Sequence, residues 1–192
     1  MQWHEAVSEL RARKLELARL DPRGGMPIRP PAGASDRDIV SVERRLGRPL
    51  PPSYRELLAS QDGWPRFFLG ASLLGTLPLS RGTFVDFARM VLEDGDLVAA
   101  AAPTGRPTYV PFGIDAKAET IFAWDLTALR PDGELGIVVL TNEVAMHVDD
   151  FPSFLELCVD MVCAEIDDRR ALTRRGVGAA RSVPAERRSR AA

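Results

Sequence analysis

Two histidines and two cysteines are the side chains best suited to metal binding or nucleophilic catalysis, and their spacing favours neither. His4 and His147 lie far apart in the sequence. Cys158 and Cys163 are five residues apart, about 140° around a helix, so they do not share a face. A zinc site needs four converging ligands. The pattern predicts no metal site. We expect Cys158 to be a core residue and His147 a half-exposed strand residue.

Motifs for other catalytic mechanisms are missing as well. The sequence has no G-x-S-x-G nucleophile elbow, no phosphate-binding loop and no dinucleotide fingerprint. Carboxylates do occur in pairs, each at a predicted turn or helix end: Asp94/Asp96, Asp149/Asp150 and Asp167/Asp168. Carboxylates at a helix start cap it and suit its dipole. We therefore expect no enzyme and no cofactor, with a hydrolase that uses scattered acids as the alternative.

Five residues are candidates for binding a protein partner. Trp64 follows a predicted turn, where a tryptophan either fills the core or anchors a partner, because it combines large area with one donor. Arg66 lies two residues further on. Asp115, Glu119 and Asp125 are predicted to form an acidic patch in the strand region, and the alternative is an ordinary charged surface.

The charge distribution points to a protein partner. Residues 169–192 hold eight arginines and one glutamate, a net charge of +7, which leaves −9 on residues 1–168 because the whole chain carries −2. An acidic body argues against direct nucleic-acid binding by the folded domain and suits a basic protein partner. The tail is rich in Ala, Gly, Ser and Pro and is predicted to be disordered. Contact of this tail with nucleic acid or an acidic partner is the alternative.

Length and hydropathy predict one soluble domain with extensions. The 192 residues contain no run of about 18 apolar residues that could span a membrane, and the first ten residues lack the apolar core of a signal peptide. Two cysteines are too few for a disulfide framework, so we expect a cytoplasmic protein. The predicted parts are 1–34, an amphipathic helix and a Gly/Pro-rich linker; 35–168, the domain; and 169–192, the basic tail.

Apolar periodicity predicts the helices. Residues 3–20 have an amphipathic 3–4 spacing, and such a helix would either pack on the domain or mediate an oligomer. A second helix begins after Ser35 or Asp36 and stops at Gly47. A third begins around Pro52. Residues 83–93 have helical spacing, and the last helix starts near Asp150 and fades at 167–170.

Short β-branched and aromatic segments predict the strands, at 67–69, 108–112, 120–125, 136–140 and 144–148. The links between the last four are short, which favours antiparallel pairing. Helices come first, then a strand meander, then a closing helix. This order predicts an α+β fold with an antiparallel-dominated sheet.

The segment from Ile39 to Trp64 resembles the opening of the SMI1/KNR4 family, also called the SUKH superfamily. That opening is a helix ending in E-x-x-L-G, then L-P-x-x-Y-x-x-x-L, then a turn with glycine. Eight residues fill these places here and are termed the signature residues below: Glu43, Leu46, Gly47, Leu50, Pro51, Tyr54, Leu58 and Gly63. Later segments are similar too: 109–112, 122–126 and 151–157. Order and spacing agree over about residues 35–166.

The resemblance implies an α+β domain without a known enzymatic site. Bacterial members of this family are mostly immunity proteins that neutralise polymorphic or contact-dependent toxins by binding them, and fungal members are regulatory scaffolds. It therefore implies a protein partner, either a secreted or contact-dependent toxin domain or the partners of a scaffold. The oligomeric state stays open.

Overall fold

The computed structural model describes residues 3–20, 29–82, 85–86, 109–141 and 145–181. The elements in chain order are α1 (Trp3–Leu20), α2 (Asp36–Leu46), α3 (Pro52–Ser60), β1 (Trp64–Phe68), β2 (Ala71–Leu73), α4 (Thr76–Arg81), β3 (Tyr109–Ile114), β4 (Thr120–Leu129), β5 (Leu135–Thr141), β6 (Ala145–Val148) and α7 (Phe151–Arg181). The helix predicted over 83–93 falls almost wholly outside the described residues.

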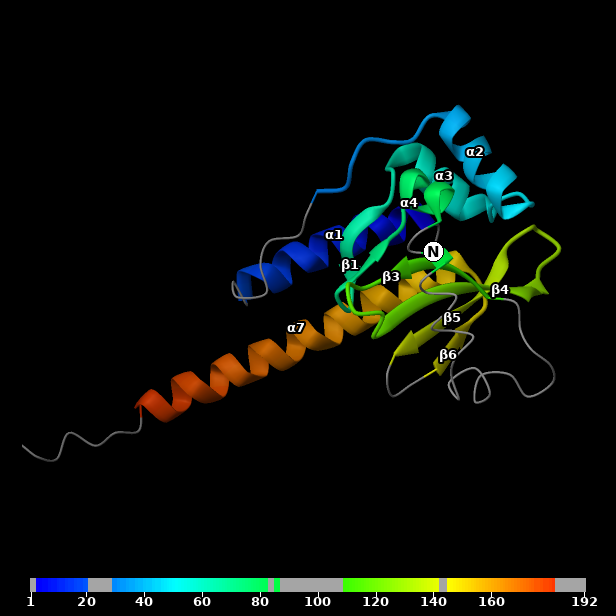
Figure 1. The fold of residues 1–192 in the computed structure, drawn as a ribbon. Helices are drawn as coiled ribbons and strands as arrows, with labels where there is room; N and C mark the ends of the chain where they lie inside the picture. The colour runs from blue at the N-terminus through cyan, green and yellow to red at the C-terminus, as the bar shows by residue number, and fades with distance from the viewer. Residues whose placement is uncertain (1–2, 21–28, 83–84, 87–108, 142–144, 182–192) are drawn as a thin grey trace, which may run out of the picture.

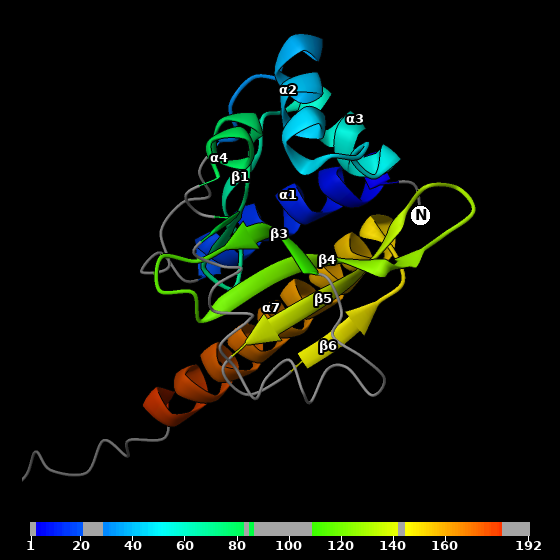
Figure 2. The same cartoon turned by 45° about the vertical axis from the view of Figure 1, so that its right-hand side comes forward.

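The six strands form one antiparallel meander in the order β1-β2-β3-β4-β5-β6. Helix α7 crosses one face of this sheet with α1 alongside it, while α2, α3 and α4 gather at one end (Figures 1 and 2). The predicted α+β class, with helices first, an antiparallel meander and a closing helix, is confirmed. Strands β3 to β6 match the four strands that the sequence predicts after residue 107, within a few residues at each end.

Local signals place α2 as predicted. The side chain of Ser35 accepts a hydrogen bond from the backbone of Asp38 and so caps the first turn. At the other end Gly47 adopts φ +69°, and the N–H of Arg48 donates to the carbonyl of Glu43. This is the Schellman arrangement, in which a glycine lets the chain leave the helix without strain.

Aromatic rings fill the layer between the sheet and α7. Phe154 of α7 lies against Phe112 of β3 and Phe122 of β4, with ring centres 6.0 and 4.9 Å away, and Trp124 of β4 stacks on Phe112. Tyr54 of α3 is completely buried and meets Phe112, Trp124 and Phe151 edge-on, at 5.0 to 5.3 Å between ring centres. Edge-to-face contacts of this kind add to the stabilisation that burial alone provides.

Helix α1 packs onto the domain, which is one of the two arrangements that the sequence left open. It buries Ala6, Val7 and Leu10 against α7. Lys14 reaches β1, where its ammonium donates to the backbone carbonyls of Arg66, at 2.7 Å, and Phe67. Lys14 thereby satisfies two backbone carbonyls of β1, the first strand in the sheet order.

The C-terminal helix is longer than predicted. Residues 169–181, which we expected to belong to a disordered tail, continue α7 as far as Arg181, and this end projects beyond the body of the molecule (Figure 1). Ala, Leu and Arg in this stretch are good helix formers, and Arg170 forms an ion pair with Glu16 of α1. Ile166, the last buried apolar residue among the described side chains of α7, therefore marks the end of the core and not the end of the helix.

The start of α3 is capped by a residue from a distant hairpin. Pro51 precedes the helix and offers no side-chain acceptor. The carboxylate of Glu134, between β4 and β5, instead accepts from the backbone N–H of Ser53 at 2.7 Å and from its hydroxyl at 2.9 Å. Glu134 is buried, and this burial raises its pKa. The cap joins the helical end of the molecule to the sheet.

We predict that E134A lowers the free energy of unfolding by about 1–2 kcal/mol, because it leaves a buried N–H without an acceptor. E134Q keeps one oxygen acceptor and should lose less. Urea denaturation of the three proteins measures the difference. An E134A protein as stable as the wild type would contradict this role for the carboxylate.

A second prediction concerns pH. Burial lowers the pKa of Lys14 to about 8, below its ordinary value of 10.5. Between these pH values the unfolded chain binds more protons than the folded one, so the contribution of Lys14 to stability rises as pH increases. The stability of the wild type relative to K14M should therefore rise from about pH 7.5 to 9.5. Urea denaturation curves that shift in parallel for the two proteins over this range would contradict the prediction.

Candidate functional site

The signature residues are used to build the fold. Glu43 accepts a hydrogen bond from the backbone N–H of Leu50, at 3.2 Å, and its carboxylate lies 3.5 Å from Arg55. Leu50, Tyr54 and Leu58 are at most 3% exposed. The Tyr54 hydroxyl donates to the carbonyl of Leu74, at 2.7 Å. These contacts show that the side chains of Glu43, Leu50, Tyr54 and Leu58 maintain the structure.

Gly63 forms a tight corner in front of β1. Its φ is +83°, and a Cβ atom there would lie 2.6 Å from the backbone nitrogen of Gly75 and 2.7 Å from the carbonyl oxygen of Leu73. No residue with a side chain fits this position. Beside it, Asp62 accepts from the N–H and the hydroxyl of Thr76 and so caps α4. The corner thereby fixes how β2 and α4 lie next to β1.

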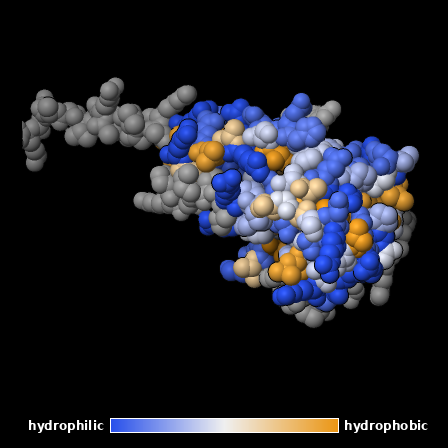
Figure 3. Space-filling view, turned by 90° about the horizontal axis from the view of Figure 1, so that it is seen from above, coloured by the Kyte–Doolittle hydropathy of each residue, from blue (hydrophilic) through white to orange (hydrophobic). Residues whose placement is uncertain are grey.

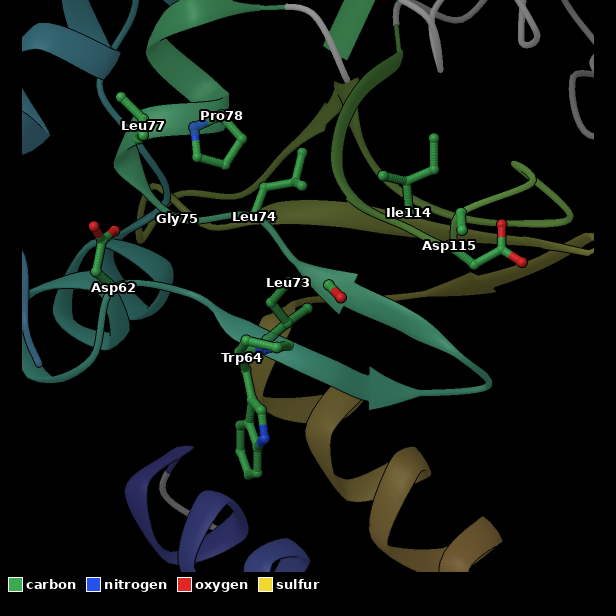
Figure 4. Close-up of a pocket in the computed structure, with 12 residues that line it drawn as sticks. Asp62, Trp64, Leu73, Leu74, Gly75, Leu77, Pro78, Ile114 and Asp115 are labelled. Atoms are coloured by element: carbon green, nitrogen blue, oxygen red, sulfur yellow. The ribbon is translucent and has the colours of Figure 1, made fainter. Parts of the chain in front are cut away.

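A pocket of about 490 Å³ opens at this corner, between β2, α4 and the end of β3. We call it the β2–α4 pocket, and Figure 4 shows its walls. It is lined mostly by apolar residues: Trp64, Pro65, Leu73, Leu74, Leu77, Pro78, Ile114 and Ala116, with Ser72, Gly75, Asp62 and Asp115 completing the wall. Leu77 is 55% exposed, unusually high for an apolar side chain at a pocket. Its volume is in the range of small-ligand and anchor sites.

Both charged residues among those lining the pocket are carboxylates. The two oxygens of Asp62 are engaged with Thr76. Oδ1 of Asp115 accepts from the N–H groups of Glu119, at 2.8 Å, and Thr120, at 3.4 Å. Among the described residues, Oδ2 of Asp115 has no hydrogen-bond donor. The pocket therefore combines an apolar interior with negative charge.

Trp64, predicted as a possible anchor, is a core residue. It is 1% exposed, and its indole points away from the pocket towards α1 and α7 (Figure 4). Two cations of α1 cover the ring: Arg11 at 5.3 Å and Lys14 at 5.8 Å from its centre. Such cation–π contacts stabilise the buried ring. Only the strand segment around Trp64 contributes to the pocket wall, so its indole cannot contact a partner in this conformation.

The predicted acidic patch does not form as one surface. Asp115 follows β3, and its backbone N–H donates to Thr120 at the start of β4. Asp125 pairs with Tyr109 at the other end of the same two strands, about 17 Å away along β4. In an antiparallel hairpin, residues close to the turn and residues far from it lie at opposite ends. Asp125 is therefore separated from Asp115 and Glu119.

Arg66 and Glu119 are neighbours of the pocket. The N–H of Arg66 donates to the hydroxyl of Ser72, which lines the pocket, at 3.0 Å. The carboxylate of Glu119 lies 3.7 Å from Lys117 in the turn after Asp115. Four of the five candidates thus lie at or beside one pocket. The apolar wall of the pocket could not be predicted from the sequence, because Leu73, Leu77 and Ile114 belong to three elements and share no periodicity.

Other residues whose types could bind a metal or catalyse a reaction lie in the core, on a strand or at the start of a helix. Cys158 is fully buried, which raises its pKa, and His147 is exposed on β6. The side chain of Asp150 accepts from the N–H of Ser153 and caps α7, as predicted. Within the described ranges, no three His, Cys, Asp or Glu residues are grouped to hold a metal ion. Asp94 and Asp96 lie outside the described residues.

The surface seen in Figure 3 shows apolar residues as small separate spots between polar ones. Scattered apolar residues of this kind are ordinary for a protein surface. No helix in the described part of the chain is long and apolar enough to cross a membrane.

Comparison with known proteins identifies the family. The profile of the SMI1 / KNR4 family (SUKH-1) matches residues 33–157, which cover α2 through the first turns of α7 and include all eight signature residues. A search of curated proteins gives no match. The matched range covers well over half of the 192 residues. The chain belongs to the SMI1/KNR4 (SUKH-1) family.

Proposed function

We propose that this protein is a non-catalytic immunity protein that neutralises a cognate bacterial toxin by direct binding. The observation that carries the proposal is that one set of residues maintains the fold and a different set lines the pocket. The signature residues serve the fold, whereas the β2–α4 pocket is an apolar hollow whose wall on the α4 side presents Leu77, 55% exposed, to solvent. A concave apolar site beside charged residues is a common anchor point for a partner.

The arrangement of the residues in the pocket favours binding of a partner over catalysis. The carboxylates of Asp62 and Asp115 accept hydrogen bonds from the protein itself. Neither is paired with a histidine or a nucleophile among the described lining residues. A hydrolase would need such groups to converge on one reacting atom. We also place the protein in the cytoplasm, where the free thiols of Cys158 and Cys163 would remain reduced.

A regulatory scaffold without a toxin partner is the second candidate function. It is favoured by one observation, the projection of α7 beyond the body as far as Arg181 (Figure 1). A scaffold would recruit partners through this helix and the arginine-rich segment after it. The N-terminal helix cannot be used to test this, because it is packed into the domain and its removal would expose Trp64.

Co-expression tests the immunity function. Cells that express a toxin domain encoded beside this gene should survive when the protein is present. L77K places a charge in the mouth of the pocket and should weaken toxin binding at least about tenfold, a loss of about 1.4 kcal/mol. L129K is the matched control, because Leu129 is 59% exposed and lies away from the pocket on β4. Its rescue should equal that of the wild type.

Two results would contradict this account. If the wild type protects against none of the neighbouring toxin domains, the immunity function is wrong. If L77K and L129K protect equally well and bind the toxin equally tightly, the pocket is not the binding site. Circular dichroism and urea denaturation of both variants confirm that any difference comes from binding and not from unfolding.

Truncation after Leu172 separates the two candidate functions. The shortened chain keeps the pair between Arg170 and Glu16 and every other side-chain contact described here. Toxin binding and rescue should be unchanged, because none of the described residues that line the pocket belongs to α7. Affinity purification with and without the segment checks this. Loss of all partners on truncation would support the scaffold.

A further inference from the structure

The β2–α4 pocket has a composition that selects its occupant. Its walls are apolar, with Leu73, Leu74 and Ile114 on the sheet side and Leu77 and Pro78 on the α4 side (Figure 4). A large apolar group bound there would remove chiefly Leu77, which is 55% exposed, from water, because Leu73, Leu74 and Ile114 are at most 5% exposed already. A volume of about 490 Å³ leaves room for a leucine-sized or indole-sized group.

The charge of the pocket is of one sign. Among its lining residues only Asp62 and Asp115 are charged. Asp115 keeps Oδ2 without a donor among the described residues, while Oδ1 holds the turn through Glu119 and Thr120. A carboxylate oxygen next to an apolar site attracts a positively charged donor. The residues beside the pocket are mixed in sign, since Arg66, Lys117 and Glu119 adjoin it, whereas residues 1–168 as a whole carry a net charge of −9.

We infer that the pocket binds a large apolar side chain that stands next to a positive charge on the partner, such as a leucine or aromatic residue beside a lysine or arginine. The inference rests on the proposed function, since the occupant is a side chain of the neutralised toxin domain. The apolar group fills the cavity, and the cation lies against Asp115 at its rim. A neutral or acidic segment would leave the carboxylates without a counter-charge, so charge selects among apolar segments.

Small probes test this chemistry without any toxin. Tryptamine, tryptophol and indole-3-propionate share an indole and carry a positive, a neutral and a negative group. Each is titrated into the ¹⁵N-labelled full-length chain, and the amide shifts of Gly75, Leu77 and Ile114 are followed by NMR. Probes of this size should bind with Kd of about 1–10 mM. We expect tryptamine to bind about two- to fivefold more tightly than tryptophol, with indole-3-propionate weakest.

Variants of the full chain locate the two parts of the interaction. D115N keeps the oxygen that accepts from Glu119 and Thr120 but removes the charge, so it should bind tryptamine and tryptophol equally. D167N is the matched control for net charge: Asp167 lies on α7, where its side chain is 78% exposed, and the tryptamine preference should persist. L77K should abolish the shifts for all three probes, and L129K should leave them unchanged.

Four outcomes would overturn the inference: no shift at the pocket amides with any probe, equal binding of the three probes, preference for the anion, or a preference that survives in D115N. If tryptamine shifts the pocket amides only after truncation behind Leu172, the occupant of the pocket is the arginine-rich tail of this chain and not the toxin. The cellular rescue is a separate measurement. Cation-selective probe binding without rescue refutes the immunity function alone, whereas rescue without cation selectivity refutes this inference alone.

Discussion

The hydroxyl of Tyr54 is the point on which the rest of the structure depends. A phenol can be placed in an aromatic core only if its O–H finds an acceptor, because an unpaired buried polar group is costly. Here the ring fills the space between Phe112, Trp124 and Phe151, and the hydroxyl donates to Leu74 just after β2. One side chain thus joins α3 to the sheet, to α7 and to the chain segment that leads into α4.

This bond also joins the core to one wall of the pocket. The carbonyl of Leu74 accepts the hydrogen bond from Tyr54, and Leu74 also lines the wall of the β2–α4 pocket. Gly63 and Asp62 fix the other side of the same segment through a close backbone approach and the cap of α4. The signature residues thereby hold a binding surface to which, among its lining residues, they contribute no side chain. Leu77 is 55% exposed, so little of the fold depends on its side chain.

The sequence predicted the parts of the fold that local signals determine. Ser35 and Gly47 bound α2, and β-branched runs between turn residues locate β3 to β6. It missed β2 and α4, because three residues are too few for an alternating pattern and Pro78 lies inside a six-residue helix. The end of α7 was misplaced for a related reason: the apolar stripe reports the core, and an ion pair between Arg170 and Glu16 lies outside that pattern.

The binding residues were harder to predict because they depend on long-range pairing. The separation of Asp125 from Asp115 follows from the register of β3 and β4, which the sequence does not specify at that resolution. The burial of Trp64 depends on Arg11 and Lys14, about fifty residues earlier in the chain. A tryptophan after a turn has the same local sequence whether or not a distant helix covers it. Only packing distinguishes the two cases.

The most direct test of this account is the effect of Y54F on stability and on partner affinity, measured separately. Removal of one buried hydroxyl leaves the Leu74 carbonyl without its donor and should lower the free energy of unfolding by about 1–2 kcal/mol. Calorimetric titration with the proposed partner, a toxin domain, well below the Tm of the variant, should give the wild-type Kd for the folded molecules. If the affinity falls while the stability stays unchanged, the side chain of Tyr54 takes part in partner binding. That result would contradict the separation between residues that maintain the fold and residues that bind the partner.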